Sequence, residues 1–203
     1  MRLVSSQLSR VSSAWHRLHT NSTSLTPAPL SLSLSLSLTE GTPGCGKSSL
    51  CEALASALGF QHVEANSIIT GKELHSGRDA AFDSLVVDED AEDKICDEME
   101  PYMGTADGGK LVDYHSGTFF PERWFDLVIV LRCDNTTLYD RLVKRGYSQK
   151  KLTENVECEI MQVVLESVRE SYQAEIIKEL QSNSMEDLDR NVDAVSQWAA
   201  AFR

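Results

Sequence analysis

Apolar residues recur along the chain in two patterns, which predict strands separated by helices. Short apolar runs suited to buried strands occupy residues 60–65, 110–115 and 125–132. Upstream of them, leucine alternates with serine from Leu32 to Thr39. Leu50, Leu54 and Leu58 recur every four residues, which is the spacing of one helix face. Strands that alternate with helices indicate an α/β fold, with a central parallel sheet and helices on both faces.

Together with the helix that contains Leu50, Leu54 and Leu58, the apolar positions predict five helices. We expect them over residues 48–58, 92–103, 136–145, 152–180 and 185–202. The segment 152–180 is expected to be long and helical. Residues 66–90 are mixed and polar, so a short helix followed by a loop is expected there.

Residues 41–48 read G-x-x-x-x-G-K-S and run directly into the first helix. Glycines in this motif let successive backbone N–H groups turn inward around a polyphosphate, and the helix N-terminus adds a favourable dipole. The lysine can reach the β- and γ-phosphates, and the serine hydroxyl can ligate Mg²⁺. The alternative is a chance glycine loop. The predicted nucleotide-binding residues are Gly44, Cys45, Gly46, Lys47, Ser48 and Ser49.

Composition limits the classes of protein that fit. A length of 203 residues suits one domain with an appended tail, and no apolar run approaches the length needed to cross a membrane. The net charge of −12 argues against a general nucleic-acid binder, although it leaves room for a ribonucleoprotein partner with a basic protein surface. Direct sequence-specific DNA binding is not expected. The five cysteines are dispersed, which fits a reducing compartment. Cys45 lies at a helix N-terminus, which predicts a lowered pKa and a reactive thiol.

The first residues differ in kind from the rest. No acidic residue precedes Glu40, and Arg2, Arg10 and Arg17 are the only charged side chains before it. Arginine and serine without acids is the composition of a transit peptide, and a disordered extension or a misassembled N-terminus is the alternative. We therefore divide the chain into an extension over residues 1–33, with residues 1–29 poorly ordered, and a folded domain over residues 34–203.

The segment before the phosphate loop is an unusual candidate for a buried strand. The chain must enter the loop from the sheet, so residues 34–39 are expected to form a short or strained central strand. Buried serines in such a strand need hydrogen-bond partners. The carboxylate of Glu40 would also oppose an adjacent phosphate electrostatically.

Two further residues are candidates for chemistry. Asp113 ends an apolar strand, where a phosphate-loop NTPase keeps the carboxylate that holds Mg²⁺. A structural aspartate at a strand end is the alternative. His115 lies two residues further on and projects from the same side, so it could orient the attacking group or a water molecule. The alternative is that His115 has a purely structural role.

Several runs resemble one family closely. These are GTPGCGKSS, VDYH at 112–115, FFPERWF at 119–125, RGY at 145–147, KKLT at 150–153 and NVECE at 155–159. In matching order from Gly41 onward, they are similar to the adenylate kinase isoenzyme 6 family of phosphate-loop NTPases. Residues 64–87 match that family less well. There Lys72 could supply the positive charge that the family has nearby.

The resemblance implies a nucleoside monophosphate kinase that uses ATP, AMP and Mg²⁺ and also has ATPase activity. It implies a monophosphate-binding segment at about 64–87 and a short lid at about 144–154. Arg145 would contact the ATP phosphates and Arg141 would be a second clamp, although a solvated helix face is the alternative for Arg141 and Lys150. The implied catalytic residues are Lys47, His115 and Arg145, with Ser48 and Asp113 as metal ligands.

The resemblance also implies a cellular role. A small-subunit ribosomal protein or pre-ribosome is the expected partner, with a role in rRNA maturation in the nucleus and cytoplasm. One alternative is an ATP-dependent assembly factor with little kinase activity, and another is a nucleotide binder weakened by its altered first strand. Mitochondrion or plastid is the alternative location if residues 1–29 act as a transit peptide.

Overall fold

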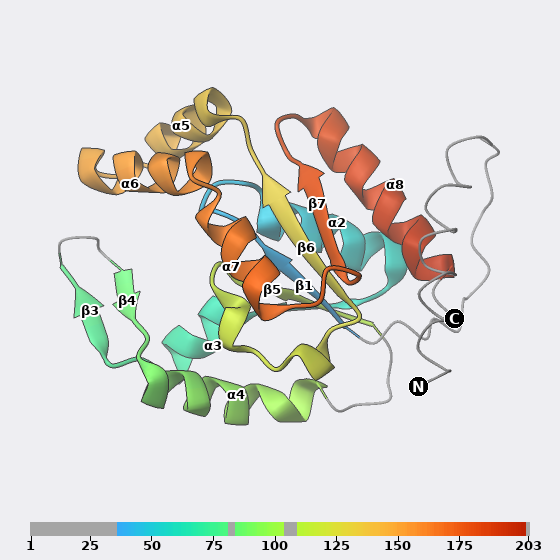
Figure 1. Cartoon of the computed structure of the whole chain (residues 1–203), viewed down its shortest axis with the longest axis horizontal. Helices are drawn as coiled ribbons and strands as arrows, with labels where there is room; N and C mark the ends of the chain where they lie inside the picture. Colours follow the sequence, from blue (N-terminus) through green and yellow to red (C-terminus); the bar gives the residue numbers. More distant parts are fainter. Residues whose placement is uncertain (1–35, 81–83, 104–108, 202–203) are drawn as a thin grey trace.

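The computed structural model describes residues 36–80, 84–103 and 109–201 (Figure 1). Its centre is a five-stranded parallel sheet in the order β2-β5-β1-β6-β7. The strands are β1 Leu36–Glu40, β2 Gln61–Glu64, β5 Lys110–Asp113, β6 Leu127–Arg132 and β7 Ile177–Gln181. The predicted α/β fold with a central parallel sheet is confirmed.

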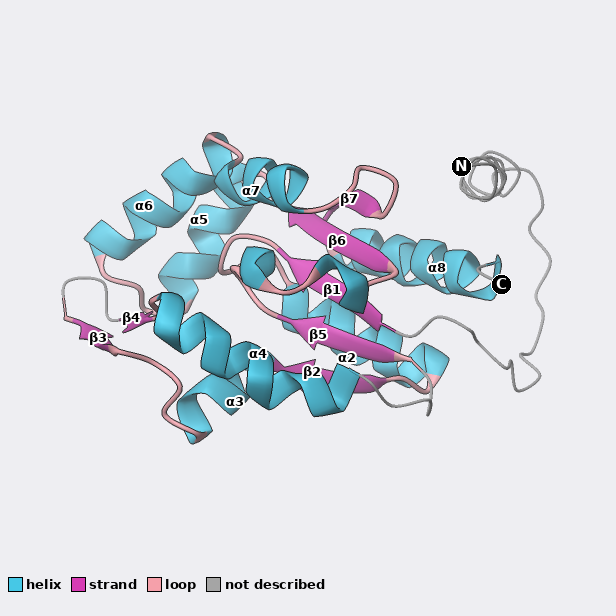
Figure 2. Cartoon of the chain, turned by 60° about the horizontal axis from the view of Figure 1, so that its bottom comes forward, coloured by secondary structure: helices cyan, strands magenta, loops and turns pink. Residues whose placement is uncertain are grey.

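Helices cover both faces of the sheet (Figure 2). One face packs against α2 (Lys47–Leu58) and α8 (Met185–Ala201). The opposite face packs against α3 (Ala65–Gly71), α4 (Glu89–Met103) and α7 (Val163–Ser171). Helices α5 (Asn135–Lys144) and α6 (Gln149–Ile160) pack on one another beyond the carboxyl end of β6. The short helices η1 (Gly117–Phe119) and η2 (Glu122–Trp124) connect β5 to β6.

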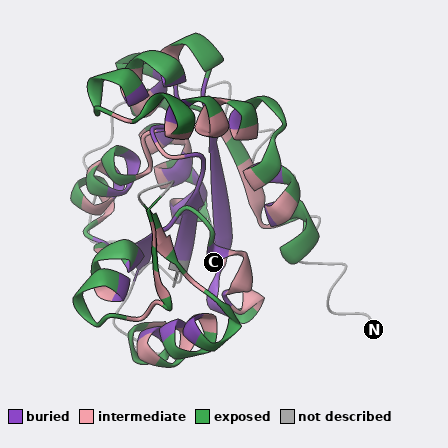
Figure 3. Ribbon diagram, turned by 90° about the vertical axis from the view of Figure 1, so that its left-hand side faces the viewer, coloured by how far each residue is buried: buried purple, intermediate pink, exposed green. Residues whose placement is uncertain are grey.

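Side chains of β6 point alternately to the two faces of the sheet, and the apolar core therefore consists of two clusters, one on each face. Leu127, Ile129 and Leu131 join the cluster formed with α2 and α8, whereas Val128 and Val130 join the cluster on the other face. All five side chains are almost completely buried. Figure 3 shows the central strands coloured as buried between helices that are largely exposed on their outer sides. This continuous apolar strand is typical of a parallel sheet that is covered on both sides.

Strand β1 occupies the centre of the sheet, hydrogen-bonded to β5 on one side and β6 on the other. Ser37 and Thr39 face α2, and Leu38 and Glu40 face the opposite layer. Ser37 is fully buried and its hydroxyl has no hydrogen-bond partner within the described part of the chain. A central strand before the loop is confirmed from Leu36 onward, and the predictions for residues 1–33 lie outside the described residues.

The expectation of a single helix over 152–180 is wrong. Gln162 has a φ of 56°, a left-handed conformation that separates α6 from α7. Tyr172 is extended and ends α7, and β7 then pairs with β6 in parallel. Apolar spacing alone cannot reveal this division, because both helices and the edge strand bury apolar residues without glycine or proline between them.

The segment 66–90 contains more regular structure than expected. The short helix is present as α3, but β3 (Gly77–Asp79) and β4 (Ser84–Val86) form an antiparallel hairpin where a loop was predicted. Strands of three residues are too short to show a period-2 pattern in the sequence.

Candidate active site

The phosphate loop connects the end of β1 to the start of α2. Gly41, Gly44 and Gly46 have φ values of 149°, 100° and 95°, which residues with a Cβ rarely adopt. A Cβ on Gly41 would also lie 2.9 Å from the carbonyl oxygen of Leu131 in β6. The motif glycines are thus required both by backbone conformation and by close packing against the sheet.

Lys47 begins α2 and folds back over the loop. Its ammonium donates to the carbonyl oxygens of Gly41, at 2.7 Å, and Thr42, at 3.4 Å. Burial lowers the pKa of Lys47, and the nearby charge of Asp113 opposes that shift. The ammonium is therefore held inside the loop, where its positive charge can neutralise a bound phosphate.

Ser48 and Asp113 meet at the edge of the loop. The register of β1 and β5 pairs Thr39 with Asp113, and this pairing brings the carboxylate beside α2. The Ser48 hydroxyl donates to Asp113 Oδ2 at 2.6 Å. Mg²⁺ prefers a few protein oxygens together with water and substrate phosphates, so this pair of oxygen donors fits it. The described residues include no cluster of three or more His, Cys, Asp or Glu suited to a metal.

A buried carboxylate, Glu159, supports the loop from behind, and no role for it could be predicted from the sequence. Glu159 Oε2 accepts from the Thr42 hydroxyl at 2.6 Å, and Oε1 accepts from Arg132 Nε at 2.7 Å. The backbone N–H of Cys133 also donates to Oε1, at 3.1 Å. Glu159 thereby joins α6, β6 and the phosphate loop. Its only sequence signal is its place in the run NVECE.

The two predicted arginine clamps lie in different environments. Arg141 Nη1 donates to the carbonyls of Gly44 and Ser182, at 3.3 and 2.8 Å, and Nη2 donates to the carbonyl of Asn183 at 3.1 Å. This guanidinium therefore braces the back of the loop. Arg145 is exposed at the end of α5, near enough to Lys47 for its charge to influence the pKa of Lys47. That Arg141 or Arg145 contacts the nucleotide is still a prediction.

The expectation of a reactive Cys45 is wrong. Its side chain is fully buried, against Cys133 and 3.8 Å from Glu159 Oε2. A hydrogen bond with Cys133 and burial together raise the pKa of Cys45 far above its usual range. The helix N-terminus is present, but exclusion of water outweighs its effect on the thiol.

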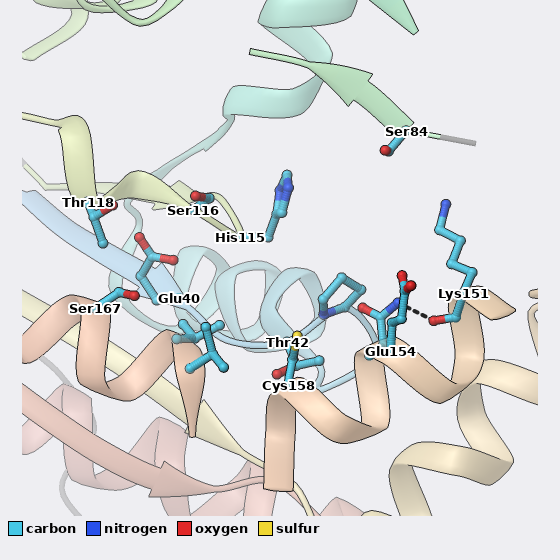
Figure 4. A pocket seen from close by; sticks show the side chains of 14 residues that line it. Glu40, Thr42, Ser84, His115, Ser116, Thr118, Lys151, Glu154, Cys158 and Ser167 are labelled. Atoms are coloured by element: carbon cyan, nitrogen blue, oxygen red, sulfur yellow. Dashed lines mark hydrogen bonds between the residues drawn. The ribbon is translucent and has the colours of Figure 1, made fainter. Parts of the chain in front are cut away.

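A pocket of about 420 Å³ opens beside the loop (Figure 4). One wall is the segment after β5, with His115, Ser116 and Thr118, and the facing wall is α6, with Lys151 and Asn155. The further lining residues are Glu40, Thr42, Pro43, Ser84, Glu154, Cys158, Val163, Val164 and Ser167. The pocket therefore brings together the loop, the predicted lid and the β3–β4 hairpin, which come from distant parts of the sequence.

His115 points into the middle of this pocket (Figure 4). The protein atoms around it, followed by the charge of Lys47, lower the pKa of His115 to about 4. Its imidazole is therefore neutral at physiological pH and can both donate a hydrogen bond to a substrate and accept one from it. By contrast, Lys72 forms an ion pair with Glu98 of α4 and does not line the pocket.

Comparison with solved structures defines the class. The shikimate kinase from Bacteroides thetaiotaomicron has a similar fold, with a TM-score of 0.57 over 81% of this chain and 98% of that chain, at 13% sequence identity. A profile of the AAA domain matches residues 38–162. With the phosphate loop and the parallel sheet, these similarities place the protein among the P-loop kinase folds.

Sequence comparison then defines the family. A relative from Dictyostelium discoideum, an adenylate kinase isoenzyme 6 homolog, is 50% identical over 161 residues, covering 79% of this chain and 89% of the relative. A homolog of the same name from Caenorhabditis elegans is 43% identical, covering 82% and 90%. The chain belongs to the adenylate kinase isoenzyme 6 family, as its motifs predicted. Within the described residues, no helix is both long and apolar enough to cross a membrane.

Proposed function

We propose that this protein is a nucleoside monophosphate kinase that transfers the γ-phosphate of ATP to AMP. The observation that carries the proposal is that Lys47, Ser48 and Asp113 gather at the phosphate loop, whose Thr42 and Pro43 line the adjoining pocket of about 420 Å³. Phosphoryl transfer needs little covalent help from the protein, so positioning and charge neutralisation account for most of the catalysis. A donor on the loop and an acceptor in the adjoining pocket would lie next to one another.

In this proposal each residue has a limited task. Lys47 neutralises charge on the β- and γ-phosphates. Ser48 and Asp113 would hold Mg²⁺, and the bound ion would offset the negative charge of the phosphates. The neutral imidazole of His115 orients the acceptor group, and Arg145 adds a cation from the lid. Arg141 keeps the loop in shape through the carbonyl of Gly44.

The test is diphosphate formation from ATP with and without AMP. The wild-type chain should form ADP faster when AMP is present, and Lys47→Ala should lose at least about 10²-fold in rate. The circular dichroism spectrum of the variant should be unchanged, because the hydrogen bonds of the ammonium within the described residues go to loop carbonyls. Near-normal turnover by Lys47→Ala, or no response to AMP in the wild type, would contradict the proposal.

One observation favours a second function, ATP hydrolysis that drives assembly of a partner. Glu40 places a carboxylate in the lining of the pocket, where a phosphate acceptor would be repelled and water would not. The family resemblance suggests a small-subunit ribosomal protein or pre-ribosome as that partner, in the nucleus and cytoplasm. ATP hydrolysis that is stimulated by purified pre-ribosomal particles and is indifferent to AMP would favour this function over the first.

A further inference from the structure

Glu40 is a buried acid with an unsatisfied oxygen. It is the last residue of β1, it is fully buried, and it precedes the first glycine of the phosphate loop. Its Oε1 accepts from the backbone N–H of Gly117 at 2.6 Å. Its Oε2 has no hydrogen-bond partner among the described residues, although the side chain lines the pocket. An orphaned carboxylate oxygen at this place needs an explanation.

The groups around Glu40 do not supply a partner for that oxygen. In Figure 4 its carboxyl group lies near Ser116, Thr118 and Ser167, away from Lys151. The Tyr172 hydroxyl at the end of α7 is bonded to the carbonyl of Gly117 at 2.6 Å.

The charged and titratable groups facing Glu40 come from each neighbouring element. They are Lys47 of α2, Asp113 at the end of β5, Tyr114 and His115 in the segment after β5, and Tyr172 just after α7, with Lys151, Glu154 and Cys158 on the α6 wall of the pocket. The ammonium of Lys47 attracts the ionised carboxylate and the carboxylate of Asp113 repels it. These two charge effects oppose one another, so burial has the largest influence on the pKa of Glu40.

The protonation state of Glu40 decides which acceptor group can lie against it. Burial raises its pKa to about 7, partly offset by the Gly117 hydrogen bond and Lys47. An ionised carboxylate can only accept hydrogen bonds, and so can a phosphate dianion, whose second pKa is about 6. Above neutral pH both groups are charged and neither can donate. Water or a hydroxyl, by contrast, can donate to the carboxylate.

We propose that Glu40 makes the acceptor pocket discriminate against a fully ionised phosphate group, so that transfer to AMP weakens with rising pH while ATP hydrolysis does not. This inference rests on the proposed kinase function and adds a specificity residue to it. It introduces no further chemical step, because Glu40 acts on binding of the acceptor. It also explains how one site supports both transfer to AMP and transfer to water.

The experiment uses Glu40→Gln in the full chain. Glutamine keeps an oxygen that can accept from Gly117 but carries no charge. For each protein, KM for AMP and the rate of ATP hydrolysis without AMP are measured at about pH 6 and about pH 8. From about pH 6 to about pH 8, KM for AMP should rise in the wild type by a factor about ten or more times larger than in Glu40→Gln. The hydrolysis rate of the wild type should not fall between the two pH values.

Glu170→Gln is the matched control, since it removes one negative charge from an exposed position on α7. This control should keep the pH dependence of the wild type. Titration of AMP itself affects all three proteins equally, so the difference between Glu40→Gln and wild type isolates the carboxylate. A Glu40→Gln variant with the wild-type pH profile of KM overturns the inference, as does one with a higher KM at both pH values.

Failure of the kinase function can be told apart from failure of this inference. Diphosphate formation by Glu40→Gln but not by the wild type would contradict the kinase function of the native chain and support the role of Glu40. If neither protein forms diphosphate, calorimetric titration with AMP at the same two pH values decides. Equal AMP affinities of wild type and variant at about pH 8 then overturn the inference.

Discussion

The Ser48 hydroxyl donates to Asp113 Oδ2 at 2.6 Å, and this bond joins the phosphate loop to the end of β5. Two oxygen donors held together in this way are expected to bind Mg²⁺ along with nucleotide phosphates. Ser48→Ala should therefore lower Mg²⁺-dependent ATP turnover by about 10²-fold, whereas Ser48→Thr, which keeps the hydroxyl, should retain most of it. The measurement is turnover as a function of Mg²⁺ concentration. An unchanged Mg²⁺ dependence in Ser48→Ala would argue against a metal role.

Glu159 should be the strongest structural determinant of the loop. Its removal leaves Arg132, which is largely buried, without its closest partner and leaves the Thr42 hydroxyl unpaired. Glu159→Ala is expected to lower the free energy of unfolding by about 3–5 kcal/mol. Glu157→Ala, an exposed change on the same helix, should stay within about 0.5 kcal/mol. Urea denaturation measures both, and similar values for the two variants would contradict the role of Glu159.

Cys45 should resist alkylation in the folded protein. It is fully buried and its pKa is raised, so little thiolate forms and no reagent can reach it. Cys158, which is partly exposed and lines the pocket, should react faster with iodoacetamide. Mass spectrometry of peptides after timed labelling measures both rates. Labelling of Cys45 before Cys158 in the folded state would show that the loop opens to solvent.

Ser37 offers a simple gain in stability. Its hydroxyl is buried in the central strand without a hydrogen-bond partner among the described residues. Ser37→Ala removes this unsatisfied group with little change in volume and should raise the free energy of unfolding by about 1 kcal/mol. Ser171→Ala, at an exposed position, is the control and should have little effect. A loss of stability in Ser37→Ala would mean that the hydroxyl is hydrogen-bonded in solution.

Glu40 should make stability depend on pH. Burial raises its pKa from 4.5 to about 7, so the protonated form is favoured in the folded state. Its contribution to stability is fully present below pH 4.5 and is lost as pH rises through about 7. Glu40→Gln does not titrate, so its advantage over wild type should grow by up to about 3 kcal/mol between about pH 5 and pH 8. Urea denaturation at both pH values measures the gap, and a constant gap would contradict the raised pKa.

Much of the site could be predicted because it is encoded locally. The glycines, Lys47 and Ser48 occupy one continuous motif, and their conformations follow from adjacent residues. Asp113 could be placed because parallel strands end at the same edge of a sheet, and the structure puts it 2.6 Å from Ser48. Glu159 could not be placed in this way, since its contact with Thr42 spans 117 residues of sequence. The burial of Cys45 likewise depends on Cys133 and α6, which no local pattern indicates.

The sequence by itself determined the α/β alternation, the phosphate loop and family membership, because these depend on periodicity and contiguous motifs. Tertiary structure alone decided that β7 is a strand, since pairing with β6 outweighs the helical spacing of its apolar residues. It also decided the state of Glu40, whose proximity to phosphate was evident from its position but whose burial was not. The energy of a charge depends on the water and charges around it, and these are contributed by α2, β5 and the segment at Gly117, which meet only in the folded chain.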